Sequence, residues 1–259
     1  MKNNKKMRLV IKIGTQVISG KNGLNKKRIR QIIIEVAEFF KLGYEVILVS
    51  SGAIATGLPF IHFKSKFHKK IAAAVGQPLL MHAYTNEAKK HKIIIGQVLI
   101  LSDDFTNRKN FKNLILNIND MLSHKVLPII NENDVMKRQD LRINDNDTLG
   151  AMVAVGVSAD KLIILTNKDG LYTKNPDHDK EAVLIKEVSK INSETMALCA
   201  TGKSALGVGG MLAKIKAAKY ATQKGVETFI GNGKKKGIII GALNENFSGT
   251  RFLAKNNNK

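Results

Sequence analysis

Residues 126–134 read VLPIINEND, so a short apolar run ends abruptly in amides and acids. Residues 126–130 are predicted to form a strand buried on both faces. The polar residues after them would lie at the carboxyl end of that strand, where open α/β sheets bind their ligands. A second cluster, residues 144–147 (NDND), follows shortly after. Together the clusters could bind a small polar molecule, hold a metal ion or orient a lysine.

Apolar strands alternate with amphipathic helices on both sides of this segment. Further strands are predicted at residues 9–13, 44–49, 93–101, 161–166, 226–230 and 238–240. Helices are predicted at residues 25–42, capped by Asn25 and closed by Gly43, and at 69–92, 110–124, 147–157, 194–200 and from the loop 207–210 to about 223. The alternation predicts an α/β fold with a mostly parallel central sheet and helices on both faces. Because no linker divides the chain, we expect a single domain over residues 1–259.

Composition narrows the function classes. The chain has 259 residues, 44% of them hydrophobic, and a single cysteine, Cys199, which cannot form an internal disulfide. It has neither a signal peptide nor an apolar run of the roughly 20 residues that span a membrane, so a cytoplasmic protein is expected. The net charge of +21 could attract nucleic acid, but base-stacking aromatics do not accompany the dispersed lysines. The alternative is a surface charge bias whose field draws in acidic small substrates, and no specific nucleic acid is expected.

Lys12 interrupts the first predicted strand, two residues before Gly14. A charge in a buried strand is costly unless it is paired. Lys12 either projects toward a phosphate at the carboxyl edge of the sheet or lies on an edge strand and faces water. The pattern alone does not decide between these interpretations.

Three further turns could bind phosphate or nucleotide. Residues 50–53 (SSGA) follow a strand and precede a helix, where backbone N–H groups can approach an anion. Residues 207–211 (GVGGM) precede a helix that places Lys214 in its first turn. The same pattern is also typical of a flexible loop before an ordinary helix. Residues 161–167 (KLIILTN) end in a polar turn, 169–172 (DGLY), that could hold a ribose or base or simply reverse the chain.

Several other chemistries lack support. Residues 201–204 (TGKS) resemble the end of a Walker loop, but Ala197 stands where that loop requires glycine. The six histidines have no metal-ligand spacing, so no protein metal site is expected. No Gly-x-Ser-x-Gly elbow indicates a hydrolase.

In their order and spacing, these motifs resemble the amino acid kinase superfamily and, within it, the glutamate 5-kinase family, from about Leu9 to Phe252. The matching segments are 12–15 (KIGT), 51–54 (SGAI), 73–77 (AAVGQ), 126–135, 145–147 (DND), 169–172 (DGLY) and 209–211 with Lys214. The resemblance implies an α/β/α sandwich with an acceptor-substrate lobe at about 1–155 and a nucleotide lobe at about 156–255. Many relatives continue into a C-terminal PUA domain, which is not expected here.

The resemblance also implies an activity. ATP would phosphorylate the γ-carboxylate of L-glutamate to give L-glutamyl 5-phosphate, the first step of proline biosynthesis. Lys12, Lys214 and Asp147 would be catalytic, the lysines gripping phosphates and Asp147 holding them. Glutamate would contact Ser51, Gly52, Asn131, Asp134 and Asn146. ATP would contact Lys12, Thr166, Asn167, Val208, Gly209, Gly210, Met211 and Lys214.

Mg²⁺ on the ATP oxygens, feedback inhibition by proline and a homo-oligomer are implied in the same way. Three positions differ from those usual in the family: Asn167 for Asp, Val208 for a hydroxyl residue, and Leu114-Ile115 for Ala-Arg. The alternatives are a kinase of the same fold with another acceptor, a binding or regulatory protein that has lost activity, and a nucleic-acid binder.

Overall fold

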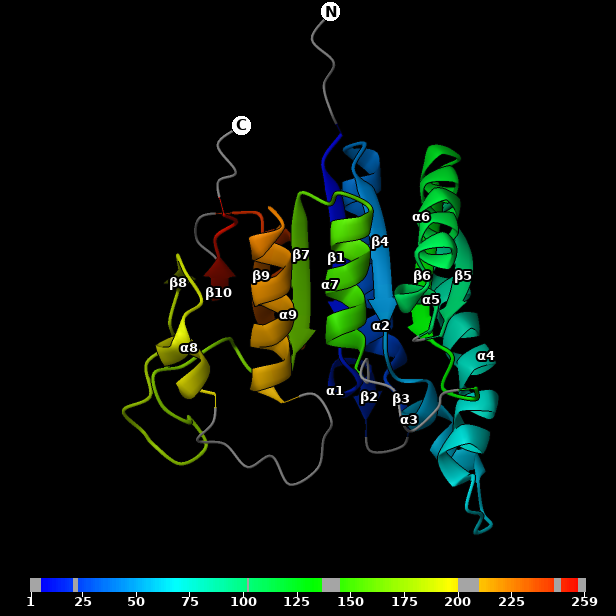
Figure 1. Cartoon of the computed structure of the whole chain (residues 1–259). Coiled ribbons are helices and arrows are strands. Elements are labelled where there is room, and N and C mark those ends of the chain that lie inside the picture. The colour runs from blue at the N-terminus through cyan, green and yellow to red at the C-terminus, as the bar shows by residue number, and fades with distance from the viewer. Residues whose placement is uncertain are drawn as a thin grey trace, which may run out of the picture.

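The computed structural model describes residues 6–20, 23–101, 103–136, 145–199, 210–244 and 248–255. An eight-stranded sheet lies at its centre, in the order β5-β6-β4-β1-β7-β9-β10-β8 (Figure 1). The strands are β1 (Arg8–Ile13), β4 (Glu45–Ser50), β5 (Ile94–Ile100), β6 (Val126–Glu132), β7 (Lys161–Thr166), β8 (Glu187–Val188), β9 (Glu227–Asn232) and β10 (Gly249–Phe252). All pairs from β5 to β9 are parallel, and only β10 and β8 run the other way. The predicted, mostly parallel sheet is confirmed.

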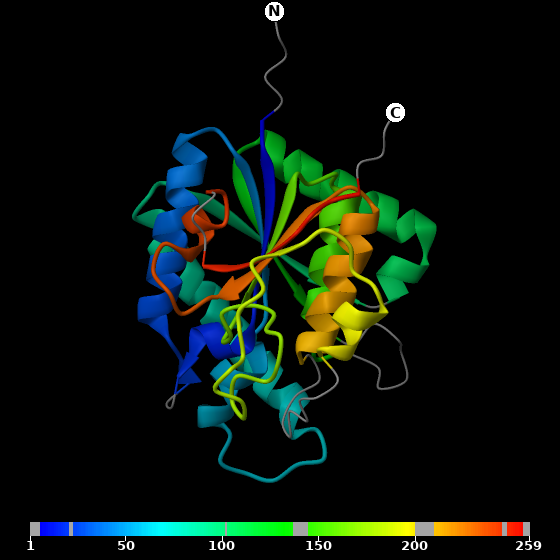
Figure 2. The same ribbon diagram turned by 90° about the vertical axis from the view of Figure 1, so that its left-hand side faces the viewer.

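Helices cover both faces of the sheet. One core lies between the sheet and α1 (Thr15–Ile18), α2 (Lys26–Lys41), α4 (His68–Lys89) and α10 (Ile238–Gly241). The opposite core lies against α6 (Arg108–Ser123), α7 (Asn146–Gly156) and α9 (Met211–Gln223). Figure 2 shows α2 in blue and α9 in orange on opposite sides of the sheet. The smaller elements are the β2 (Ser19–Gly20) and β3 (Gly23–Leu24) hairpin, α3 (Ala53–Gly57), a 3₁₀ turn (Leu58–Phe60), α5 (Asp103–Thr106) and α8 (Ser193–Ala197).

The central strand β1 decides between the two interpretations of Lys12. Successive side chains of a strand point to opposite faces, so Lys12 shares a face with Val10, which packs in the core beside α7 and α9. Because β1 pairs with β4 on one side and β7 on the other, it is not an edge strand. The interpretation in which Lys12 faces water from an edge is therefore wrong.

Local signals placed helix α2 correctly. The side chain of Asn25 accepts a hydrogen bond from the backbone N–H of Arg28, which caps the first turn. Gly43 follows the helix with a φ of 77°, a conformation that costs glycine little. The predicted helix 194–200 is shorter in the structure, since α8 ends at Ala197.

The strand predicted at residues 238–240 is wrong, because these residues form helix α10. Three consecutive isoleucines are typical of a strand. The buried carboxylate of Glu35, on α2, instead accepts hydrogen bonds from the backbone N–H groups of Gly237, Ile239 and Ile240 at 3.1, 2.8 and 3.3 Å. This distant side chain satisfies the open amides of the first turn, which a local pattern cannot reveal.

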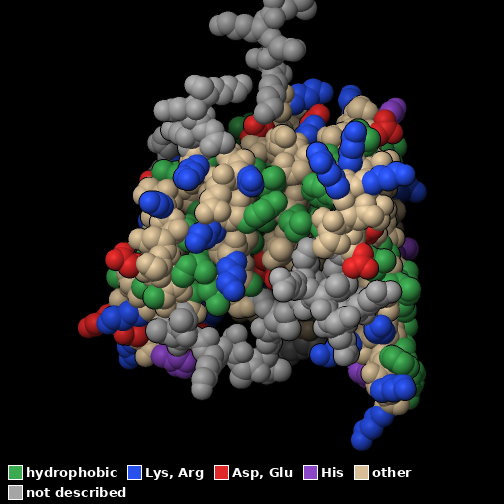
Figure 3. All heavy atoms as spheres, in the orientation of Figure 1, with side chains coloured by type: hydrophobic (Ala, Val, Ile, Leu, Met, Phe, Trp, Pro, Cys, Tyr) green, Lys and Arg blue, Asp and Glu red, His purple; other side chains and the backbone are tan. Residues whose placement is uncertain are grey.

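Surface charge is dispersed. In Figure 3, Lys and Arg side chains are scattered over the face covered by α6, α7 and α9, between apolar and neutral groups. No helix among the described residues is long and apolar enough to span a bilayer. The described Lys and Arg side chains of this face do not form a single stripe of the kind that tracks a nucleic-acid backbone (Figure 3).

Candidate active site

The carboxyl ends of the central parallel strands meet at one edge of the sheet and border a cavity of about 780 Å³. Residues that follow β1, β4, β6 and β7 line it, together with the first turns of α7 and α9. The lining contains Lys12, Ser51, Gly52, Asp134, Asn146, Asp147, Thr166, Asn167, Gly210, Met211 and Lys214. Most of the residues selected from the sequence are therefore brought together around one space.

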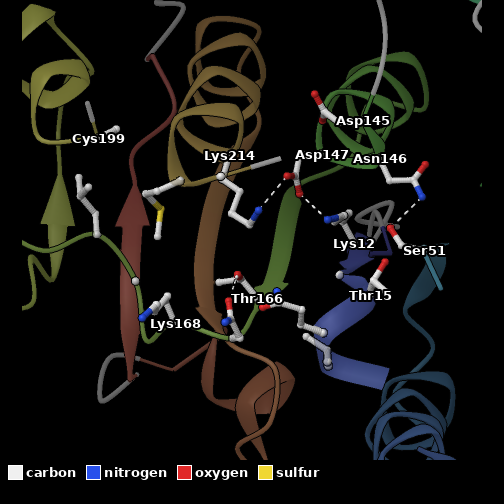
Figure 4. A pocket seen from close by; sticks show the side chains of 18 of the residues that line it. Lys12, Thr15, Ser51, Asp145, Asn146, Asp147, Thr166, Lys168, Cys199 and Lys214 are labelled. Atoms are coloured by element: carbon white, nitrogen blue, oxygen red, sulfur yellow. Dashed lines mark hydrogen bonds and ion pairs between the residues drawn. The ribbon is translucent and has the colours of Figure 1, made fainter. Parts of the chain in front are cut away.

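Asp147 links two lysines from distant parts of the chain. Its Oδ1 lies 2.6 Å from Lys12 Nζ, and its Oδ2 accepts a hydrogen bond from Lys214 Nζ at 3.0 Å. All three side chains are at most 10% exposed. Figure 4 shows Asp147 lying between the two ammonium groups, which come from β1 and α9. The single negative charge of Asp147 thus offsets one of the two positive charges at the wall of the cavity.

The charges of this triad alter the pKa of two of its members. Burial raises the pKa of Asp147, but the attraction of Lys12 and Lys214 outweighs it, so that the pKa lies below 3.8. Burial lowers the pKa of Lys12 below 10.5, because one anion, Asp147, only partly compensates for burial and for the repulsion of Lys214. Both pKa values fall, because the two lysines outweigh burial at Asp147, whereas burial and Lys214 outweigh the carboxylates of Asp147 and Asp145 at Lys12.

One half of the cavity presents hydroxyl, amide and carboxylate groups. Gly52 has a φ of 108°, and this left-handed turn places Ser51 at the end of β4. Asn146 Nδ2 donates to Ser51 Oγ at 2.8 Å and to Asn131 Oδ1 at 2.9 Å. Asn131 is only 1% exposed and lies behind Asn146, outside the cavity lining. Asn131, which was predicted to contact the substrate, therefore supports Asn146 from behind the cavity wall.

The other half extends beyond β7. Thr166 Oγ1 donates to Asn167 Oδ1 at 3.3 Å, and Lys168 Nζ lies 2.6 Å from Asp177 Oδ2. Gly210 precedes α9, and Gly210, Met211 and Lys214 at the start of this helix line the cavity. Val208 and Gly209, which were predicted to bind ATP, lie outside the described residues.

Several lining residues were missed by the sequence analysis. They include Thr15, Gln16, Lys168, Lys174, Leu198 and Cys199. Lys168 could have been suspected from its place beside a turn at the end of β7, whereas Leu198 and Cys199 follow a helix that no motif marked. Burial raises the pKa of the Cys199 thiol to about 11, which leaves it protonated and poorly nucleophilic.

Comparison with known proteins identifies the family to which the chain belongs. Residues 7–232 match the model of the amino acid kinase family, and the chain belongs to that family. Solved structures share the fold: carbamate kinase from Giardia lamblia bound to AMP-PNP (TM-score 0.68, 16% identity, 96% of this chain and 99% of that one) and isopentenyl phosphate kinase (TM-score 0.66, 18% identity, 95% and 99%).

The sequence is also similar to curated proteins that share a single name, glutamate 5-kinase. The chain is 41% identical over 254 residues to the glutamate 5-kinase of Clostridium acetobutylicum, covering 96% of this chain and 95% of the relative. It is 39% identical over 256 residues to the glutamate 5-kinase of Streptococcus sanguinis, covering 97% and 69%.

Proposed function

We propose that this chain transfers the γ-phosphoryl group of ATP to the γ-carboxylate of L-glutamate, forming L-glutamyl 5-phosphate for proline biosynthesis. The observation that carries the proposal is the buried Lys12–Asp147–Lys214 triad between two differently lined halves of one cavity. Paired lysines at that point suit a phosphoryl group in transit between two anions. The names of the relatives at 39–41% identity supply the acceptor.

Each half of the cavity has a role in this proposal. Glutamate binds in the lobe of residues 1–155, at Ser51, Gly52, Asp134 and Asn146, with Asn131 behind them. ATP binds in the lobe of residues 156–255, at Thr166, Asn167, Gly210, Met211 and Lys214, which line the cavity, and at Val208 and Gly209, which lie outside the described residues. Lys12 and Lys214 lie where the halves meet, within reach of the phosphates.

The chemistry requires positioning more than proton transfer. The γ-carboxylate has a reference pKa of about 4.3, so it is already ionised at neutral pH and needs no general base. One of its oxygens bonds to the γ-phosphorus as the bond to the β–γ bridging oxygen breaks, and ADP leaves with that electron pair. The two lysines offset the repulsion between the carboxylate and the polyphosphate. Asp147 is ionised and paired, so it orients the lysines and does not accept a proton.

Mg²⁺ fits this cavity as a companion of ATP. The described residues contain no group of three His, Cys, Asp or Glu side chains that could hold a metal ion. Mg²⁺ typically binds phosphate oxygens and waters with one or two carboxylates. When bound, it would neutralise charge on the phosphates, and Glu132, Asp134 and Asp145 are among the carboxylates that line the cavity beside them.

The test is ATP consumption with Mg²⁺ and L-glutamate, with the acyl phosphate trapped by hydroxylamine. We expect hydroxamate with L-glutamate and none with aspartate or N-acetylglutamate. The matched variant Lys214→Met, which keeps most of the side-chain volume, should abolish the product. ATP binding without turnover on any acceptor would instead support a regulatory relative, and hydroxamate with another acid would support a kinase with a different acceptor.

We propose two further properties from the family resemblance. L-Proline should inhibit the enzyme, acting near residues 131–147, of which 137–144 lie outside the described residues. The chain should also form a homo-oligomer. Initial rates with and without millimolar proline test the first, and sedimentation velocity tests the second.

A further inference from the structure

A chain of amide groups runs from helix α4 to the wall of the cavity. Gln77 Oε1 accepts a hydrogen bond from Asn131 Nδ2 at 2.9 Å. Asn131 Oδ1 accepts from Asn146 Nδ2 at 2.9 Å, and the same Nδ2 donates to Ser51 Oγ at 2.8 Å. Gln77 does not line the cavity, so any effect it has on a ligand must pass along this chain.

One backbone group fixes the direction of every hydrogen bond in the chain. The N–H of Glu132 donates to Asn131 Oδ1 at 2.9 Å, and a backbone N–H can only donate. The atom of Asn131 that faces it must therefore be the oxygen. The other end of that amide is then a donor, which requires the acceptor oxygen of Gln77. The atom of Asn146 that meets Asn131 Oδ1 must likewise be its nitrogen.

This direction determines what Ser51 offers to a ligand. Because Ser51 Oγ already accepts from Asn146, its hydroxyl hydrogen is left to donate, and among the described residues Oγ has no second partner. Ser51 is half-buried and lines the cavity, and Figure 4 shows its hydroxyl facing the Asn146 amide there. The single hydrogen of this hydroxyl suits a carboxylate oxygen, which can only accept.

We propose that Gln77 is a positioning residue: through Asn131 and Asn146 it holds the Ser51 hydroxyl as a hydrogen-bond donor to a carboxylate of the acceptor amino acid. The inference rests on the proposed function, whose acceptor it concerns. Asn131 is 1% exposed, so without Gln77 its buried Nδ2 loses its acceptor. An unsatisfied buried donor is costly, and the amide would rotate to find a partner and release Asn146.

The packing of α4 holds Gln77 in place. A Cβ on the preceding residue, Gly76, would lie 1.9 Å from the carbonyl oxygen of Ala53, so this glycine allows α4 to contact α3 directly behind the Ser51 turn. Two turns further along α4, the Tyr84 hydroxyl lies 2.8 Å from Ser50 Oγ, which itself donates to the Ser51 carbonyl. The same helix therefore supports both the backbone and the side chain of Ser51.

A double-mutant cycle tests the inference. The cost of Ser51→Ala in kcat/KM for L-glutamate is measured by hydroxamate formation in wild type, Gln77→Met and Gln77→Glu. Methionine matches the length of glutamine but has no strong acceptor, whereas a glutamate carboxylate still accepts from Asn131. Loss of a hydrogen bond to a charged group corresponds to a decrease of roughly 10-fold or more in kcat/KM. Ser51→Ala should therefore lower kcat/KM by about that factor in wild type and in the Gln77→Glu background. In the Gln77→Met background it should lower kcat/KM only slightly.

The control and the outcomes separate positioning from general damage. Gln77→Met should raise KM for L-glutamate and leave KM for ATP unchanged, while Gln97→Met, at an exposed site on β5, should change neither. Gln77→Ala serves in the cycle if Gln77→Met does not fold. An undiminished cost of Ser51→Ala in the Gln77→Met or Gln77→Ala background overturns the inference. Absence of glutamate-dependent hydroxamate in wild type overturns the proposed function instead.

Discussion

Replacing Asp147 with asparagine tests the energetics of the lysine pair. The substitution keeps the shape of the side chain and removes its charge. Lys12 Nζ, 2.6 Å away, and Lys214 Nζ, 3.0 Å away, then share a buried site with no anion between them. Breaking a buried ion pair by removing one partner costs about 3–5 kcal/mol, because the remaining charge is left without compensation. Here two charges are left, so we expect the free energy of unfolding to fall by at least about 3 kcal/mol.

The assay is urea unfolding at neutral pH, with Glu38→Gln as the matched control. Glu38 also pairs with a lysine at 2.8 Å, but its side chain is 50% exposed and that of its partner Lys41 is 67% exposed. An exposed pair on a helix contributes about 0.5 kcal/mol or less. If Asp147→Asn and Glu38→Gln lower the free energy of unfolding equally, the reasoning about a buried, structurally essential charge fails.

Four other outcomes are expected. Lys12→Met should lower kcat roughly 10²–10³-fold, as steady-state kinetics would show. It should destabilise the fold less than Asp147→Asn in urea unfolding, because Lys214 still pairs with Asp147. Because the pKa of Lys12 is lowered, kcat/KM for ATP should begin to fall at a pH below 10.5, and a limb at 10.5 or above would contradict this. Because the pKa of Asp147 is lower in the folded state than in the unfolded state, its ionisation stabilises the fold at pH values above the unfolded-state pKa. This stabilisation is lost as pH falls through the folded-state pKa, below 3.8. Acid-unfolding curves of Asp147→Asn should therefore show less of this loss than those of wild type. Glu35→Ala should lower the free energy of unfolding by about 3 kcal/mol or more, because it leaves the amides of α10 open and removes the buried charge partner of Arg28, 3.9 Å away. Hydroxamate formation by the remaining folded enzyme should be retained.

Local patterns predicted much of the architecture. The apolar run before Asn131, the Asn25 cap and Gly43 are complete within a few residues, so β6 and α2 could be located from the chain alone. Strand β10 was missed, because its four residues lack a long apolar pattern and it pairs antiparallel to β9 at the weakly specified end of the sheet. The α10 segment was misassigned because its cap comes from Glu35, about 200 residues earlier in the chain.

In the candidate site, too, local patterns identified the residues but not the contacts between them. Lys12, Asp147 and Lys214 could be selected because a charge in a strand, an acid-amide cluster and a lysine after a glycine-rich loop are each visible in sequence. That Asp147 holds both lysines was implied only by the family resemblance. No local pattern shows it, since the contact depends on β1 lying beside β4 and β7 with α7 and α9 on the same face. The position of Gln77 behind Asn131 likewise depends on how closely α4 packs against α3.

The sequence by itself therefore determined the alternation of strands and helices, the parallel sheet and the edge at which polar groups collect, because periodicity and capping act within one or two turns of chain. Only the tertiary structure decided how Asp147 bridges the two lysines, which way the amides behind Ser51 point, and that residues 238–240 form a helix. Buried charges and amides must find partners wherever the fold brings them, and that requirement acts between residues far apart in the chain.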